Sequence, residues 1–142
     1  MENTQSKTIT VETVVNNPIE KIWAHWNEPA HITKWYFASD DWHAPKAEND
    51  LRIGGKFTIR MEAKDGSFGF DFNGTYDDII TYKLISYKIE GGRKVQVEFF
   101  SHGNTTKVIE TFEPENENPV EMQKAGWQAI LNNFKKYAEA KN

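Results

Sequence analysis

The spacing of apolar residues changes between two periods along the chain, and these periods predict its secondary structure. Segment 7–15, KTITVETVV, has apolar residues at alternate positions, with Ile9, Val11 and, less regularly, Val14. This period of two predicts a β-strand. The same period returns in several consecutive segments between residues 56 and 112, and elsewhere the spacing changes to that of a helix.

Two predicted helices follow the same start signal. NPIE at positions 17–20 and NPVE at 118–121 each supply Asn as the N-cap, Pro at the first helical position and Glu at the third. A second short helix is predicted over residues 30–35, and the terminal helix from residue 119 to about residue 139. The first helix gathers four apolar residues on one face: Ile19, Ile22, Trp23 and Trp26.

The segments between residues 56 and 112 predict antiparallel strands. KDGS at 64–67, Gly91-Gly92 and Gly103-Asn104 are turn sequences, and strands joined by short turns pair antiparallel. Segment 37–50 has no sustained period and is expected to be a loop. The order of elements indicates an α+β fold in which the terminal helix buries its apolar stripe against the sheet.

Two adjacent glycines, Gly54 and Gly55, stand directly before a strand. A phosphate-binding loop requires the pattern GxxxxGK[ST] before a helix, or GxGxxG within a βαβ unit, and neither is present. Glycine at the entrance of a strand permits a bulge or a sharp bend. We therefore expect a structural role here, with Asp50 and Arg52 forming an ion pair that holds the incoming segment.

Composition narrows the classes of function. A chain of 142 residues predicts one domain over residues 1–142, with residues 1–7 disordered. A net charge of −4 and the lack of a basic run exclude nucleic acid as a partner. The absence of cysteine excludes disulfides and Cys-type zinc sites, and the four histidines lack zinc spacing, so no metal site and no cofactor are expected. No apolar run predicts a secretory signal or membrane span, which indicates a cytoplasmic protein.

Several motifs carry a resemblance to a known family. PIEKIWAHWNEPAHITKWY, DLRIGGKF, the strand around Gly74 and GWQAILNNFKKY follow one another in the family's order. Over residues 9 to 138 the chain resembles the activator of Hsp90 ATPase, C-terminal-domain type. That family is part of the START-like (SRPBCC, Bet v 1-like) helix-grip superfamily, which includes polyketide cyclases.

The resemblance implies a curved antiparallel sheet wrapped around a long C-terminal helix, with two short helices after the first strand. It also implies a cavity between sheet and helix, which commonly holds an apolar small molecule in such folds. Eukaryotic relatives contact the Hsp90 chaperone, but their stimulating activity also uses an N-terminal domain that these 142 residues do not include.

Apolar side chains on the predicted inward faces are the candidate ligand-binding residues, and a plain hydrophobic core is the alternative interpretation. Trp127 is the first candidate, because it follows Gly126 within the helix. A glycine there costs about 1 kcal/mol relative to alanine, which close packing on a strand or space for a ligand would explain. The candidates are Trp26, Trp35, Phe57, Met61, Phe70, Phe72, Tyr87, Trp127, Ile130 and Phe134.

Three functions are compatible with this pattern. The first is binding of an apolar or amphipathic small molecule, oriented by Tyr87, Arg60 or His43, although Arg60 is predicted to point outward. The second is a protein-interaction module of the Hsp90-activator type, which needs an exposed patch. The third is an enzyme that uses the cavity, which needs a buried titratable group with a shifted pKa; the sequence offers no clear candidate.

Overall fold

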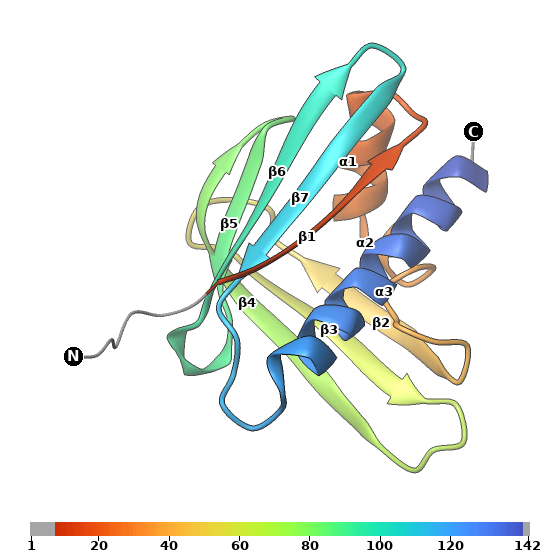
Figure 1. The fold of residues 1–142 in the computed structure, drawn as a ribbon, viewed down its shortest axis with the longest axis vertical. Helices are drawn as coiled ribbons and strands as arrows, with labels where there is room; N and C mark the ends of the chain where they lie inside the picture. Colours follow the sequence, from red (N-terminus) through yellow and green to blue (C-terminus); the bar gives the residue numbers. More distant parts are fainter. Residues whose placement is uncertain (1–7, 141–142) are drawn as a thin grey trace.

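Residues 8–140, which the computed structural model describes, contain a seven-stranded antiparallel sheet and three α-helices (Figure 1). The expectation of disorder for residues 1–7 lies outside the described residues. The elements are β1 (Ile9–Val15), α1 (Ile19–Asn27), α2 (Pro29–Ile32), β2 (Trp42–Asn49), β3 (Lys56–Ala63), β4 (Gly69–Ile80), β5 (Leu84–Lys88), the 3-10 turn η1 (Glu90–Gly92), β6 (Lys94–His102), β7 (Thr105–Phe112) and α3 (Val120–Ala140).

Strands β2 to β7 form a meander, in which each strand pairs with the next one along the chain. β1 is the exception, because it pairs with β7, which gives the order β1-β7-β6-β5-β4-β3-β2. The sheet curves, and α3 lies across its concave side (Figure 1). The predicted α+β helix-grip architecture is confirmed, and α3 begins within one residue of the expected position.

The chain turns from β1 into α1 differently from the prediction. Val15 continues the buried period of β1 and is fully buried, whereas Val14 is 48% exposed.

Asn17 was expected to cap α1, but Pro18 occupies the N-cap position. The Asn17 side chain instead donates from Nδ2 to the carbonyl of Ala138 at 2.7 Å, and the backbone carbonyl of Asn17 accepts from Thr106 Oγ1 at 2.9 Å. Asn17 therefore joins the end of α3 to the sheet.

The expectation of a loop over residues 37–50 was wrong, because residues 42–49 form the edge strand β2. Only Ala44 of this strand is buried, so its side chains need not alternate between apolar and polar. Pro45 hides the strand further from sequence patterns. It lies where the β2–β3 register shifts between His43 and Lys46, which is a position that proline tolerates in a sheet.

The structural role predicted for Gly54 and Gly55 is confirmed. Gly54 has φ +83°, and its N–H donates to the carbonyl of Tyr76 at 2.9 Å. A Cβ on Gly55 would lie 2.1 Å from the carbonyl oxygen of Asp50, so only glycine fits there. The expected ion pair is also present, with Arg52 Nε at 2.9 Å from Asp50 Oδ2.

Candidate functional site

A cavity of about 290 Å³ lies between the first half of α3 and the concave side of the sheet. The backbone of α3 lies close to β1 and α1, so the distance to β3 and β4 is spanned by side chains. The lining comes from β3, β4, β7, α3 and the segments before β2, before β6 and before α3. Its residues are Tyr36, Met61, Phe70, Phe72, Arg93, Glu110, Glu115, Gln123, Trp127 and Ile130.

Aromatic rings form the fixed walls of this cavity. Trp127 stacks on Phe112 with ring centroids 3.9 Å apart and planes at 9°, and meets Phe72 edge to face at 6.3 Å. Phe72 in turn stacks on Tyr36 at 5.8 Å. Such ring pairs add to the stability that area burial alone provides, so these walls are held in place without a ligand.

The cavity opens at a gap in the sheet. β4 pairs with β5 only from Thr75 onward, where Thr75 lies opposite Lys88. Residues 69–74 of β4 therefore have no partner in β5. A hollow of about 500 Å³ occupies this gap between β4 and η1, and it shares Phe70, Phe72 and Arg93 with the cavity lining. The hollow and the cavity therefore adjoin at these three residues.

Glu110 is the polar side chain at the bottom of the cavity. It occupies an inward position of β7 between Val108 and Phe112, which are both fully buried, and is itself 3% exposed. Within residues 8–140, no hydrogen bond or ion pair engages its carboxyl group. Burial disfavours the ionised form and raises the pKa of Glu110 to about 8.

Two tyrosines, Tyr36 and Tyr87, lie close to this carboxyl group. Burial raises the pKa of Tyr36 well above its usual value, and the charge of Glu110 raises it further; the same two effects act on Tyr87. Tyr76, which lines a smaller void with Tyr36 and Tyr87, donates to Asn49 Oδ1 at 2.6 Å. These hydroxyl groups are neutral, so they do not balance a charge on Glu110.

Three other polar side chains line the rim of the cavity: Arg93, Glu115 and Gln123. In contrast to Glu110, they have hydrogen-bond partners close by. Gln123 accepts from the backbone N–H of Glu115 at 2.9 Å and donates to the carbonyls of Glu115 and Asn118. Hydrogen bonds from Asn118, then from the backbone of Glu117, and the nearby charge of Arg93 lower the pKa of Glu115. Arg93 also donates to the carbonyl of Glu113 at 3.1 Å.

The ten candidate residues from the sequence fall into three groups. Met61, Phe70, Phe72, Trp127 and Ile130 line the cavity.

Trp26, Phe57 and Tyr87 line a separate, much smaller void of about 30 Å³. Trp35 and Phe134 are fully buried and pack on each other with ring centroids 4.7 Å apart, as core side chains do.

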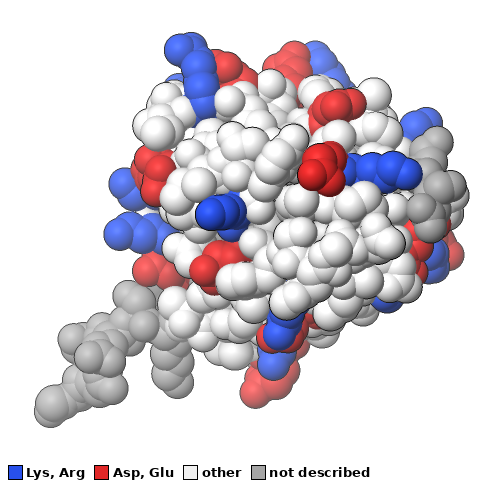
Figure 2. All heavy atoms as spheres, turned by 90° about the horizontal axis from the view of Figure 1, so that it is seen from above, with Lys and Arg blue, Asp and Glu red and all other residues white. Residues whose placement is uncertain are grey.

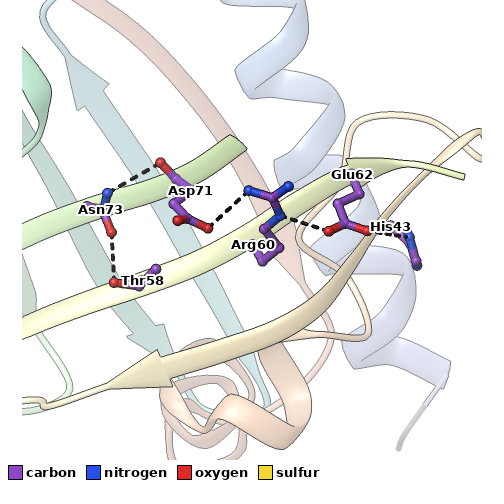
Figure 3. Close-up of polar contacts among 6 residues, drawn as sticks. All are labelled: His43, Thr58, Arg60, Glu62, Asp71 and Asn73. Carbon is purple, nitrogen blue, oxygen red and sulfur yellow. Dashed lines mark hydrogen bonds and ion pairs between the residues drawn. The ribbon is translucent and has the colours of Figure 1, made fainter. Parts of the chain in front are cut away.

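The structure places Arg60 and His43 on the outer face of the sheet rather than in the cavity lining (Figure 3). Arg60 Nε lies 2.8 Å from Glu62 Oε2, and its Nη1 lies 3.5 Å from Asp71 Oδ1. His43 Nε2 is 3.7 Å from Glu62 Oε1. The prediction that Arg60 points outward was correct, and neither side chain is placed to orient a ligand in the cavity.

Sequence reasoning missed five cavity residues, of which Glu110 is the most important chemically. The others are Tyr36, Arg93, Glu115 and Gln123. The signal for Glu110 was available, because the period of two in β7 places it on the same face as Val108 and Phe112. Close packing does not explain Gly126, since a Cβ there would meet no atom within 4 Å.

Metal sites, membrane-spanning helices and basic patches are three further features that would indicate a different function. Among residues 8–140, no three His, Asp or Glu side chains are grouped to hold a metal ion. None of the helices described here is long and apolar enough to cross a membrane. On the face in Figure 2, the charged side chains of the described residues are of both signs and surround a mostly uncharged centre. That face has no continuous basic patch for a phosphate backbone.

Comparison with known proteins gives the family. The model of the Activator of Hsp90 ATPase homolog 1-like proteins matches residues 16–139. The chain belongs to this family. A comparison with curated proteins gave no match.

Solved structures of other Activator of Hsp90 ATPase homolog 1-like proteins and related chains agree with this assignment. The AHSA1-like protein from Aeromonas hydrophila is 43% identical, with a TM-score of 0.89 over 95% of this chain and 94% of that one. A protein from Cytophaga hutchinsonii is 56% identical, with a TM-score of 0.81 over 94% and 93% of the two chains.

A protein from Nitrosomonas europaea is 16% identical and shows the fold alone, with a TM-score of 0.81 over 95% of this chain and 96% of that one. The fold is that of the Bet v 1-like helix-grip superfamily, which commonly binds hydrophobic ligands.

Proposed function

We propose that this protein binds an apolar or amphipathic small molecule in the cavity between α3 and the sheet. The observation that carries the proposal is an aromatic-lined space of about 290 Å³ where a sheet and helix of this kind would otherwise pack together. Its volume is at the low end of the range of about 300–1,000 Å³ for small-molecule sites. The hollow beside η1 adjoins it and is the proposed route of entry.

Burial of apolar surface supplies most of the affinity in this proposal. Each Å² of apolar surface removed from water contributes about 25 cal/mol before the costs of ordering are subtracted. The rings of Trp127 and Phe72 are already fixed by their contacts with Phe112 and Tyr36, so little side-chain entropy is lost when a ligand enters. A rigid ligand that matches the walls is therefore favoured.

Native mass spectrometry of freshly purified protein tests the proposal. We expect an added mass that disappears on denaturation, or a rise in melting temperature with members of a panel of lipids and aromatic compounds. Ile130→Trp fills the cavity and should abolish both signals. Lys124→Trp adds the same side chain at an exposed position of α3 and should leave both unchanged. This function would be excluded if the added mass and the melting-temperature rise both persisted in Ile130→Trp. It would also be excluded if the wild-type protein showed no added mass and no shift with any compound.

Contact with an Hsp90-type chaperone is the second candidate function, and the family description favours it. Two apolar side chains at the start of α3 support it, because Met122 is 60% exposed and Val120 is 41% exposed. Capture of purified Hsp90 by the wild-type chain and its loss in Met122→Glu would support this candidate. Equal capture by both proteins would count against this surface.

An enzyme that uses the same cavity is the third candidate. It requires a buried titratable group, and Glu110 meets that requirement. Mass spectrometry of a ligand recovered after incubation distinguishes this candidate from simple binding. A changed mass that depends on Glu110 would indicate catalysis, whereas an unchanged mass would indicate binding alone.

A further inference from the structure

We propose that the ligand of this cavity is an organic cation, an amine on an apolar body, whose protonated nitrogen pairs with the carboxylate of Glu110. This inference rests on the proposed function and names the chemical class that the cavity selects. Three observations carry it: the missing partner of Glu110, the missing positive charge around it, and the aromatic walls.

A wholly apolar ligand fits this cavity poorly. Glu110 is 3% exposed and lines the space, and within the described residues nothing bonds to its carboxyl group. Water can satisfy that group while the cavity is open. An apolar ligand removes the water without replacing its hydrogen bonds, which lowers affinity roughly ten- to a hundredfold. The ligand must therefore bring a polar group to the bottom of the cavity.

The charges around Glu110 indicate the sign of that group. Arg93 is the one cation among the described lining residues; it donates to the carbonyl of Glu113 at the rim, and its charge lies near enough to Glu115 to lower the pKa of that carboxyl group. The tyrosines close to Glu110, Tyr36 and Tyr87, are neutral. The lining residues from β3, β4 and α3 are uncharged as well: Met61, Phe70, Phe72, Gln123, Trp127 and Ile130. Glu110 is thus the one carboxyl group of this lining without a balancing charge, which a cationic ligand would supply.

The surroundings favour a cation in two further ways. Trp127, Phe72 and Tyr36 present aromatic rings to the cavity, and aromatic rings attract cations as well as apolar groups. The segment between β7 and α3, residues 113–119, carries three glutamates and no Lys or Arg. It adjoins the cavity through Glu115, so it raises the local concentration of cations beside the cavity.

Binding of such a ligand should release a proton. Burial keeps most Glu110 carboxyl groups protonated at neutral pH, whereas pairing with an ammonium group favours the carboxylate. The Glu110 O–H bond breaks, its proton passes to solvent, and the ligand keeps its own proton. We therefore expect about one proton released per amine bound at pH 7, and an amine affinity that rises between pH 6 and 8.

Three probes of matched shape test the inference: 1-naphthylmethylamine, 1-naphthalenemethanol and 1-naphthoic acid. Isothermal titration calorimetry at pH 7, in buffers of different ionisation enthalpy, measures affinity and proton release together. We expect the amine to bind wild type at least tenfold more tightly than the alcohol, with proton release. Glu110→Gln should lose the preference and the release while still binding the alcohol. Glu98→Gln removes a carboxylate from the outer face of β6 and should retain both.

Equal affinity for amine and alcohol, or tightest binding of the acid, would overturn the inference and leave the cavity-binding function standing. A preference for the amine that persists in Glu110→Gln would overturn it as well. So would the failure of all three probes to bind wild type. The proposed function is judged separately, by the mass retained in native mass spectrometry and its loss in Ile130→Trp.

Discussion

Replacing Glu110 by glutamine should stabilise the protein by an amount that grows with pH. The pKa of Glu110 is about 8 in the folded protein, against an ordinary value of 4.5. Between these two values the folded state holds a proton that the unfolded state has lost. The stability associated with this group is therefore fully present below pH 4.5 and is lost as pH rises through 8.

The magnitude follows from the size of the shift. Each pKa unit corresponds to about 1.4 kcal/mol. Glu110 therefore lowers the free energy of unfolding of the wild-type protein by about 3 kcal/mol at pH 7 and by about 5 kcal/mol above pH 8. Glutamine has nearly the same shape and does not titrate. The advantage of Glu110→Gln over wild type should thus rise by about 4 kcal/mol between pH 5 and pH 9, a large fraction of a typical domain's stability.

Urea denaturation followed by tryptophan fluorescence at pH 5, 7 and 9 measures this difference directly. Other titrating groups contribute equally to both proteins and cancel in the comparison. Glu98→Gln, which changes a carboxylate on the outer face of the sheet, controls for the loss of one negative charge. A stability difference between Glu110→Gln and wild type that does not change with pH would refute the reasoning, because it would mean that Glu110 ionises as freely in the folded state as in the unfolded chain.

Three glycine substitutions test the packing. Gly74→Ala places a Cβ 2.2 Å from the Phe57 ring, so we expect a loss of about 1–3 kcal/mol in urea denaturation, and a loss below 0.5 kcal/mol would contradict the close contact. Gly126→Ala meets no atom within 4 Å and should raise the stability by about 1 kcal/mol through helix propensity; destabilisation would show that the site is not open. Gly54→Ala should cost about 1–2 kcal/mol, because φ is +83° there, and an unchanged unfolding midpoint would argue against that backbone conformation.

The elements that the sequence predicted well are those whose side chains have one covered face. Val95, Val97 and Phe99 alternate with less buried residues in β6, and Leu131, Phe134 and Ala138 recur at helical spacing in α3. β2 was missed because only Ala44 in it is buried, so its side chains do not alternate between covered and exposed; β1, at the opposite edge, keeps its alternation because α3 packs against it.

The division between cavity and core could not be predicted in the same way. Phe57 and Phe72 are chemically identical and occupy inward positions of neighbouring strands, yet Phe72 lines the cavity and Phe57 lines only the small void. The difference comes from where α3 stands relative to each strand. That spacing depends on long-range contacts such as the bond from Asn17 to Ala138, which local sequence patterns do not encode.

The pairing of β1 with β7 has a consequence for the order in which the chain folds. Ile9 pairs with Phe112 and Val15 with Thr106, so the first strand has no neighbour in the sheet until β7 has been made. At about 5–20 residues per second, the ribosome needs on the order of 5–20 s to synthesise the intervening chain. During that time the backbone of β1 has no partner strand, and Ile9, Val11 and Val15 are not yet covered by α3. The meander from β2 to β6 can form hairpin by hairpin as it emerges, but closure of the sheet by β1 has to wait for nearly the whole chain.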